Sequence, residues 1–456
     1  MTEEKASNNE NDTAKNDNEA SSRHQPWTLE EMNQILEKTN EILSKLDDEL
    51  TIAREQETQQ SHYQSWLKGK ISMEENKSKI TDTCRYFDMF GFVKMNEFVS
   101  LPKIQNLKDD MKSLTEEKWD PTNIMAFQTD EKSNTKQGSN DYFLESASRV
   151  HFFAEPSALM DTSDGSQQLK PYYQQNIDTK LAALNKAGHG MHTLEGSAFQ
   201  QYATSSTLQT LVHELGFRDP VIPQSMYIFK QPHIGGAIHS HQDSTFLFTE
   251  PQQSCLGLWL ALDDATLENG CLWVRPKSHN EHVRRQFKRN SDFFGADAIE
   301  QRSNVRITPT NDTSCAQSCT RKNQINTNEP GPPKMIMERL VTDDYYNDTA
   351  PWEGALPPEA EDDPLALLEA GFIPIECKAG DLLAFGGQLD HLSLPNYSPK
   401  PRHTFQLHLV EGPKAGITWS KHNWLQYPPN QEFISIAMDN DTESCCKEMV
   451  PNDGAE

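Results

Sequence analysis

Two histidines and one aspartate in this chain have the residue types and the order of a mononuclear iron site. His241 and Asp243 are separated by one residue, and His391 follows far downstream. Two imidazoles and one carboxylate form the facial ligand set that binds Fe(II) and leaves the remaining coordination positions open. Those positions would accept a chelating co-substrate and O₂. The three residues therefore predict a metal site that activates oxygen.

An arginine beyond the second histidine indicates which co-substrate this site would use. Arg402 follows His391 by eleven residues, and a guanidinium offers two parallel N–H donors that match a carboxylate. Polar residues at every second position from Arg402 to His408 would share one face of a strand. Such a row inside an apolar domain requires a polar ligand. We therefore expect 2-oxoglutarate, with its far carboxylate on Arg402.

Other histidines compete for the role of metal ligand. His239 has the same strand parity as His241, so it could replace that residue or support the ligands from behind. His279 and Glu281 form a second pair with the same spacing, since glutamate can replace aspartate. A lone pair of this kind arises by chance in a chain with 15 histidines. The glycine turn before His241 and the apolar residues after Asp243 favour these two as ligands at the mouth of a barrel.

Several short strands are expected to position these residues. Apolar and aromatic runs, alternating or bounded by turn residues, occur at 226–230, 256–262, 382–385 and 404–410. Many short strands without alternating helices predict a β-sandwich or jelly roll. Asn269-Gly270 predicts a hairpin turn, which would return the chain from the 256–262 strand into residues 271–274.

Helices are expected to flank the strands. Apolar spacing predicts a helix that runs into a short strand near residues 87–93 and a helix over 103–117. The aromatic residues of 142–154 predict strands. Two further helices are expected at 176–186 and 199–216. The fold class expected is mainly β with flanking helices.

The expected catalytic domain covers 82–428 and is extended at both ends. Residues 1–26 are polar and without aromatic residues, which predicts a disordered tail. Residues 27–80 predict an amphipathic helical extension. Residues 286–370 are an acidic, Pro/Asn-rich stretch that we expect to be an insertion in a surface loop. Residues 429–456 are expected to form a C-terminal tail.

The N-terminal extension is expected to begin with a helix at Thr28. Thr28 and Glu31 have the spacing of a capping box. The apolar residues that follow recur at helical spacing, which predicts a stripe along one side of the helix. This stripe could dock on the catalytic domain or mediate self-association through the 28–52 helix.

Charge and cysteine content exclude several kinds of partner. The formal net charge of −26 would repel phosphate backbones, so we expect no nucleic acid. The eight cysteines include no CxxC pair, which argues against a structural zinc module. No apolar run approaches the length of a membrane span, and no signal peptide is evident. A cytoplasmic location is the expectation.

One short segment of this acidic chain is rich in basic residues. Arg284 and Arg285 are followed by Lys288 and Arg289. The pair Arg284-Arg285 could contact an anionic substrate, such as a CoA nucleotide or a carboxylate. A solvated basic face would have the same pattern.

Longer motifs give the chain a resemblance to a known family. The segments 224–236, 241–251, 264–273 and 418–426 resemble the phytanoyl-CoA dioxygenase (PhyH) family, over roughly 82–285 and 371–428. The resemblance implies a double-stranded β-helix (a cupin-like jelly roll) that binds Fe(II) through His241, Asp243 and His391. It implies contacts to 2-oxoglutarate from Lys186, Met226, Trp259, Ser393 and Arg402. The first 80 residues and the 286–370 insertion exceed the usual domain of the family.

These observations predict an Fe(II)- and 2-oxoglutarate-dependent dioxygenase. It would hydroxylate a small-molecule or lipid-type substrate, with release of succinate and CO₂. Related halogenases replace the acid by a small residue, so Asp243 argues against halogenation. One alternative is a catalytically silent sensor that binds the metal and 2-oxoglutarate. Another, a cupin-like isomerase or storage protein, would not need Arg402 and Lys186. The substrate, the binding of CoA thioesters and the oligomeric state stay open at this point.

Overall fold

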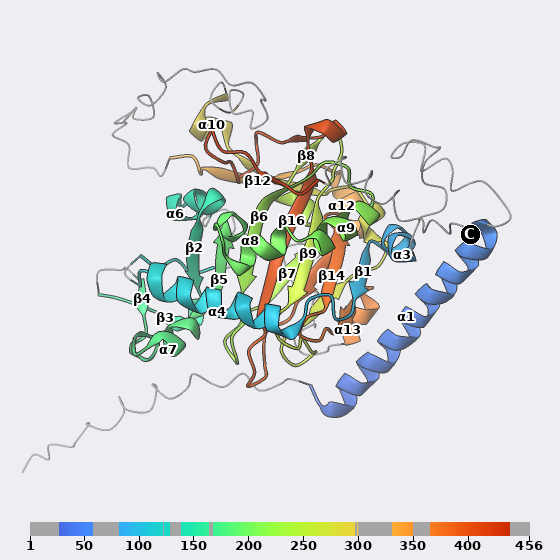
Figure 1. Cartoon of the computed structure of the whole chain (residues 1–456), viewed down its shortest axis with the longest axis horizontal. Helices are drawn as coiled ribbons and strands as arrows, with labels where there is room; N and C mark the ends of the chain where they lie inside the picture. The colour runs from blue at the N-terminus through green and yellow to red at the C-terminus, as the bar shows by residue number, and fades with distance from the viewer. Residues whose placement is uncertain are drawn as a thin grey trace, which may run out of the picture.

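Two antiparallel sheets form the centre of the protein. The computed structural model describes residues 27–57, 82–121, 123–127, 138–163, 167–296, 299, 331–349 and 365–437. The tail expected at 1–26 and much of the insertion and C-terminal tail lie outside these residues. Within the described part, the two sheets pack against each other and helices cover the outer face of the larger one (Figure 1). This arrangement is a jelly roll, so the expected fold class, mainly β with flanking helices, is confirmed.

The larger sheet has the order β1-β14-β9-β16-β6-β5-β2, and β18 pairs with β6. Its strands are β1 (Phe92–Met95), β2 (Val150–Ala154), β5 (Leu184–His189), β6 (Pro220–Ile228), β9 (Leu256–Ala261), β14 (Leu382–Gly386), β16 (Thr404–Glu411) and β18 (Ile434–Ser435). The smaller sheet has the order β13-β10-β15-β7. Its strands are β7 (Ile238–His241), β10 (Leu272–Val274), β13 (Ile373–Ile375) and β15 (His391–Ser393).

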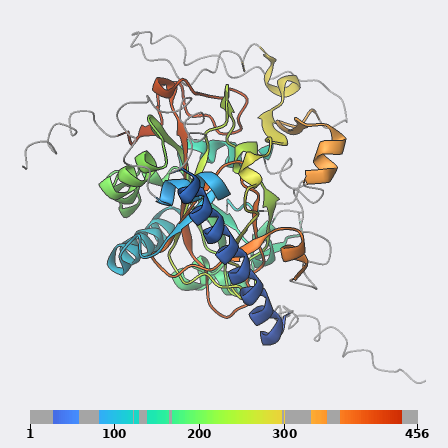
Figure 2. The ribbon, with the colours of Figure 1, turned by 90° about the vertical axis from the view of Figure 1, so that its right-hand side faces the viewer.

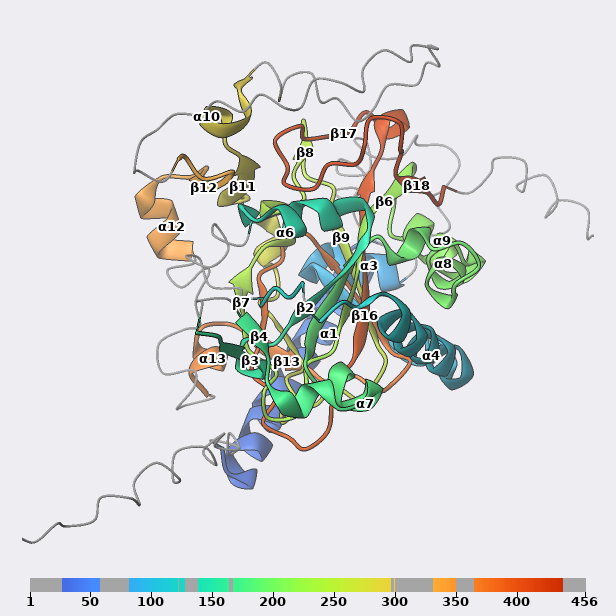
Figure 3. The ribbon, with the colours of Figure 1, turned by 90° about the vertical axis from the view of Figure 1, so that its left-hand side faces the viewer.

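Three two-stranded sheets and a set of helices surround this centre. The pairs are β3 (Leu159–Asp161) with β4 (Gln167–Leu169), β8 (Thr249–Glu250) with β17 (Thr418–Trp419), and β11 (Arg285–Arg289) with β12 (Met335–Arg339). The helices are α1 (Leu29–Glu57), α3 (Asp82–Phe90), α4 (Leu101–Lys118), α6 (Asp141–Glu145), α7 (Ile177–Leu181), α8 (Ala198–Ala203), α9 (Ser206–Glu214), α10 (Ser291–Phe294), α12 (Asp343–Thr349) and α13 (Leu365–Glu369). The β11–β12 pair and α10 lie together at one end of the sheets (Figure 3).

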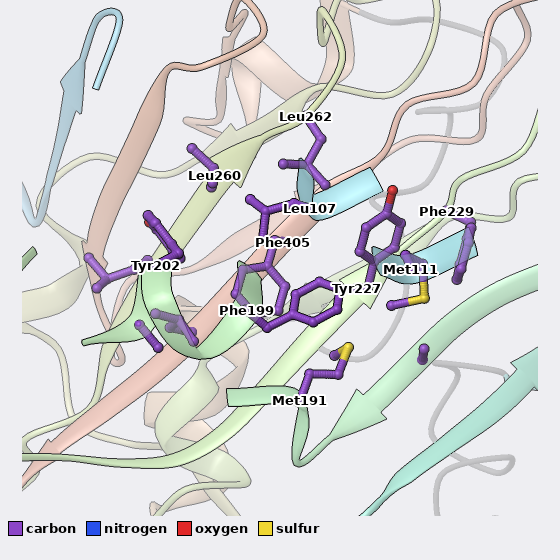
Figure 4. Packing of buried hydrophobic residues seen from close by; sticks show 14 of the residues in the cluster. Leu107, Met111, Met191, Phe199, Tyr202, Tyr227, Phe229, Leu260, Leu262 and Phe405 are labelled. Carbon is purple, nitrogen blue, oxygen red and sulfur yellow. The ribbon is translucent and has the colours of Figure 1, made fainter. Parts of the chain in front are cut away.

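The larger sheet has one apolar face and one polar face, as the alternation of residues along a strand requires. Phe405 and Leu407 of β16 pack against α4, α8 and α9, and Phe199 and Tyr227 lie in the same buried cluster (Figure 4). Gln406, which lies between them in β16, points to the opposite face, toward the smaller sheet. The helices therefore cover one face, and the other face is left for a site.

Helix α1 docks on the domain through its apolar stripe. Its capping box forms as expected, because the Thr28 N–H donates to Glu31 Oε2 (2.7 Å) and the Glu31 N–H donates to Thr28 Oγ1 (3.2 Å). Ile35 and Leu46 are buried in a cluster with Phe372, and α1 packs against α3, α13 and β13 (Figure 2). The stripe is thus covered within the chain. Self-association through the 28–52 helix would have to use a different face of the helix.

Three local expectations are wrong, and each fails for a reason of context. Residues 141–145 form helix α6, capped by Asn140, where strands were expected from the aromatic residues. The helix expected over 176–186 ends at Leu181, and β5 begins at Leu184. Asn269-Gly270 is not a hairpin turn, because β9 and β10 belong to different sheets. Gly270 has a φ of 82°, so the chain does turn at this glycine. The strands before and after the turn, however, do not pair with each other.

Of the helices in the described residues, none is long and apolar enough to cross a membrane.

Candidate active site

The two histidines and the aspartate singled out in the sequence meet at the rim of the smaller sheet. His241 ends β7, and His391 begins β15 as its direct partner in the sheet. The backbone turns after His241 and brings Asp243 back toward both rings. Asp243 Oδ1 lies 3.5 Å from His241 Nε2 and 3.7 Å from His391 Nε2. Three potential ligand atoms therefore converge within 4.8 Å of one another, as one metal ion requires.

Hydrogen bonds set the tautomers of both histidines. His241 Nδ1 lies 2.7 Å from the carbonyl oxygen of His239, and His391 Nδ1 lies 3.0 Å from that of Leu389. A carbonyl oxygen can only accept, so in each neutral ring Nδ1 carries the proton. Both Nε2 atoms then present a lone pair toward Asp243. This is the state in which imidazole binds a metal.

His408 of β16 holds the second oxygen of the carboxylate. His408 Nε2 donates to Asp243 Oδ2 at 3.0 Å, because His408 Nδ1 accepts from the Gln224 side-chain amide at 3.1 Å. Gln224 belongs to β6, which neighbours β16. The larger sheet therefore orients a ligand carried by the smaller one and leaves Asp243 Oδ1 directed at the histidines.

The charges of the site favour metal binding. Burial acts to raise the pKa of Asp243, but His408, His391 and His241 together hold that pKa well below its usual range. Burial and the neighbouring His241 lower the pKa of His391 to about 4. The carboxylate is therefore ionised and His391 is neutral near neutral pH, which are the forms that coordinate a cation.

A cavity of about 160 Å³ opens from these residues between the two sheets. All five residues that the family resemblance implies for 2-oxoglutarate line it: Lys186, Met226, Trp259, Ser393 and Arg402. The strand register explains part of this. Trp259, Gln406 and Met226 are cross-strand partners in β9, β16 and β6, so they form one row on the inner face. Residues far apart in the sequence thus become one wall.

Two buried basic side chains line the cavity and form no ion pair within the part of the chain that the structure describes. Arg402 is 2% exposed and Lys186 is 2% exposed, and in the described part of the chain neither forms an ion pair. Burial lowers the pKa of Arg402 to about 10 and holds the pKa of Lys186 well below its usual range. A buried charge without a counter-ion is costly. The pair is therefore suited to an anion supplied by a ligand.

Lys186 is held among aromatic rings rather than by a carboxylate. Its ammonium lies 3.5 Å from the centroid of the Phe127 ring and 3.2 Å from His189 Nε2. Contact with a ring face stabilises a cation weakly compared with an ion pair. The ammonium can therefore exchange this contact for a ligand carboxylate.

The remaining candidates from the sequence separate in the structure. His239 lines the cavity but lies outside the cluster of metal-ligating atoms. Arg285 also lines the cavity, whereas the neighbouring Arg284 does not. The Arg284 side chain is fully buried on Asp390 and Glu281, so the expected substrate contact is not supported for this residue. Glu281 takes part in the same ion pairs. The structure therefore gives no support to His279 and Glu281 as an alternative pair of metal ligands.

Sequence reasoning did not assign a role to three buried polar residues of the site. Gln224 and His408 support Asp243, and Lys230 donates from Nζ to Ser393 Oγ at 2.9 Å. His408 stands in the polar row that begins at Arg402, which was the available signal. Gln224 and Lys230 lie in and just after an otherwise apolar strand, and only the pairing of β6 with β16 brings them to the site.

A cavity between the sheets of a jelly roll, with these ligand atoms at its rim, is the site of a 2-oxoglutarate-dependent dioxygenase, and comparisons with known proteins agree. The family model for phytanoyl-CoA dioxygenase (PhyH) matches residues 87–404. The chain belongs to this family. The family uses Fe(II) and 2-oxoglutarate, and the donor set of His241, Asp243 and His391 suits Fe(II).

Individual relatives match most of the chain. A phytanoyl-CoA dioxygenase from Arabidopsis thaliana is 34% identical over 76% of this chain and 93% of its own length. The phytanoyl-CoA dioxygenase domain-containing protein 1 of Mus musculus is 33% identical over 67% of this chain and 79% of its own. Among solved structures, EctD from S. alaskensis with 2-oxoglutarate and 5-hydroxyectoine is 14% identical, with a TM-score of 0.39, and covers 75% of this chain and 80% of that one.

Proposed function

We propose that this chain hydroxylates a small organic substrate, using Fe(II) held by His241, Asp243 and His391, and 2-oxoglutarate held by Arg402. The observation that carries the proposal is the convergence of the three ligand atoms with two buried cations in one cavity. A metal site alone would not require those cations. A binding site for an organic anion alone would not require the ligand atoms.

The chain's own residues would bind and orient the co-substrate. The guanidinium of Arg402 would take the far carboxylate, with Ser393 beside it and Lys230 behind Ser393. Lys186 would neutralise the remaining negative charge, and Trp259 and Met226 would form the apolar walls. When bound, Fe(II) supplies the oxidation by O₂ that splits 2-oxoglutarate into succinate and CO₂ and adds one oxygen atom to the substrate.

Aromatic residues would exclude water and receive the substrate. Phe127, Phe143, Phe246, Phe287 and Trp424 also line the cavity. Rings around a reacting centre keep bulk water away from it. Ligand pockets commonly measure about 300–1,000 Å³, so a cavity of about 160 Å³ would hold only the reacting part of a larger lipid or acyl substrate.

The charge of the cavity lining favours an anionic substrate. Among the described residues that line the cavity, Asp243 is the only carboxylate, and it would be bound to the metal. Arg285 lies on β11 and reaches the cavity with Phe287. A cationic substrate would find no further carboxylate there, whereas a carboxylate or a phosphate would be attracted by Arg285. We therefore place small carboxylates and acyl thioesters first in a substrate screen.

An anaerobic titration tests the proposal. Fe(II) and 2-oxoglutarate added together should produce the visible charge-transfer band of the chelate, and admission of O₂ should then yield succinate. The His241→Ala variant should give neither signal. His213→Ala, at an exposed position on α9, is the matched control and should behave like the unaltered protein.

The outcomes separate the proposal from its alternative. A sensor would give the band but no succinate with any candidate substrate. Absence of the band from the unaltered protein would show that the ligand set or Arg402 has been misassigned, and it would overturn the proposal.

A further inference from the structure

A cluster of ion pairs lies next to His391, where β10 ends and β15 begins in the smaller sheet. We call it the arginine cluster; it consists of Arg275, Glu281, Arg284 and Asp390. The Arg284 side chain is 0% exposed and that of Asp390 is 1% exposed. Asp390 immediately precedes His391 in the chain. None of the four residues lines the cavity, so the cluster is not in contact with a ligand bound there.

The cluster is fully cross-connected. Each arginine contacts both acids: Arg284 bonds to Asp390 Oδ1 and, at 2.8 Å, to Glu281 Oε2. Arg275 binds Glu281 through two parallel bonds of 2.7 Å and binds Asp390 Oδ2 through Nε at 3.0 Å. The Asp390 backbone N–H is held by Ser278 Oγ at 2.9 Å. The residue before His391 is therefore fixed through both its side chain and its backbone.

Gln242 connects this cluster to the other two ligands. It stands between His241 and Asp243 and is 0% exposed. Gln242 Oε1 accepts from the Arg284 backbone N–H at 3.1 Å, and Nε2 donates to the carbonyl of Gln388 at 2.9 Å. Its side chain thus bridges from the turn that carries His241 and Asp243 to the turn that leads into His391.

We propose that Gln242 and the arginine cluster position the three metal ligands relative to one another, and so set the metal affinity of the site. This proposal rests on the proposed function, because it assumes that the ligand set binds a divalent metal. Gln242 is a positioning residue here, since its side chain does not line the cavity and instead bonds to backbone atoms of Arg284, Gln388 and His282.

The energetics favour positioning over stability as the role of this cluster. Burying charged groups costs desolvation energy, and apolar replacements of buried ion pairs are often as stable. Fork-shaped arginine–carboxylate pairs, in contrast, define distance and angle closely. A ligand site gains from such fixed geometry, because residues that support metal ligands commonly change metal affinity by about 10- to 100-fold when removed.

Gln242→Met tests the proposal, because it keeps the length and burial of the side chain and removes its hydrogen bonds. Mn(II) alone serves as the probe, with affinity measured by calorimetry and folding by the apo-protein melting temperature. We expect Mn(II) affinity to fall about 10- to 100-fold. The matched control is Gln231→Met. Gln231 is also buried and donates to two backbone carbonyls, those of Leu181 and Leu184, and its loss should leave Mn(II) affinity unchanged.

A second variant covers a failure of Gln242→Met to fold. Arg284→Lys keeps the charge but cannot reach Glu281 and Asp390 as a fork, and it should lower Mn(II) affinity in the same direction. Unchanged affinity in either folded variant would overturn the proposal. An equal loss in Gln231→Met would also overturn it, because the effect would then reflect general destabilisation. Failure of the unaltered protein to bind Mn(II) would instead count against the proposed function.

Discussion

Arg402 and Lys186 are buried basic side chains, and keeping either of them charged in the absence of a ligand costs free energy. Each has lost its hydration, and neither forms an ion pair within the described residues. Such a cost is understandable at a site where an anion completes the pair. Replacing either residue should therefore weaken the binding of 2-oxoglutarate without lowering the stability of the apo protein.

Replacement of Arg402 by methionine tests this at one residue. Without the guanidinium, binding of 2-oxoglutarate should weaken by at least about 30-fold, which corresponds to the loss of roughly 2 kcal/mol or more for a buried charge partner. The melting temperature of the apo protein should stay constant or rise, because an uncompensated buried cation has been removed. Calorimetry and thermal denaturation measure the two effects. A fall in melting temperature with unchanged 2-oxoglutarate affinity would contradict this assignment.

The lowered pKa of Lys186 leads us to expect that the protein takes up protons when 2-oxoglutarate binds. Burial lowers the pKa of Lys186 in the free protein, so part of the population is neutral at pH values above that lowered pKa. An approaching carboxylate raises the pKa again, and the amine then takes up as much as about one proton per ligand. Titrations in buffers of different ionisation enthalpy measure this number. Uptake should increase as pH rises above the lowered pKa and should disappear in Lys186→Met.

At the scale of elements, the sequence predicted the strands that carry the site better than it predicted their partners. The runs at 256–262, 382–385 and 404–410 correspond to β9, β14 and β16, because short apolar runs bounded by turn residues are typical of buried strands. The pattern does not record which strand pairs with which. The expected hairpin at Asn269-Gly270 failed for that reason, since the chain crosses there from one sheet to the other.

Because strand pairing is not recorded in the sequence pattern, the arrangement of residues around the metal ligands could not be predicted either. His241 and His391 could be selected by residue type, but their closeness depends on the direct pairing of β7 with β15. Arg284 and Arg285 look equivalent in the sequence. One enters the arginine cluster and the other reaches the cavity, because adjacent residues of an extended chain point in opposite directions. Only the tertiary structure shows that Arg284 enters the arginine cluster and Arg285 reaches the cavity.

Helix α1 should contribute to the stability of the whole domain. Ile35 is 0% exposed and packs in the cluster that includes the smaller sheet. Ile35→Ala should lower the free energy of unfolding by about 2 kcal/mol or more, as core truncations of isoleucine do. The control is Ile52→Ala on the same helix, which is 52% exposed and should change stability by less than about 0.5 kcal/mol. Equal effects in urea denaturation would show that α1 is not docked in solution.

At the scale of the whole molecule, the site contrasts with the surface around it. The formal net charge is −26, yet the cavity presents Arg402, Lys186 and Arg285. A negatively charged surface slows the approach of anions, while enclosed cations retain them through short-range contacts that salt screens little. A preference of the proposed site for anions would therefore come from the cavity and not from the overall charge.

Metal and 2-oxoglutarate together should stabilise the protein more than the sum of their separate effects. The metal ligands belong to the rim of the smaller sheet, whereas Lys186, Met226 and Trp259 belong to the larger sheet. A co-substrate that chelates the metal and also contacts these residues would connect the two sheets, so each ligand should raise the affinity for the other by the same factor. At a hundredfold excess over its Kd, a ligand that binds only the folded state adds about 2.7 kcal/mol. Melting curves with Mn(II), with 2-oxoglutarate and with both measure this coupling. In Arg402→Met the Mn(II) effect should persist while the coupling is lost, and additive shifts in the unaltered protein would show that the two ligands bind independently.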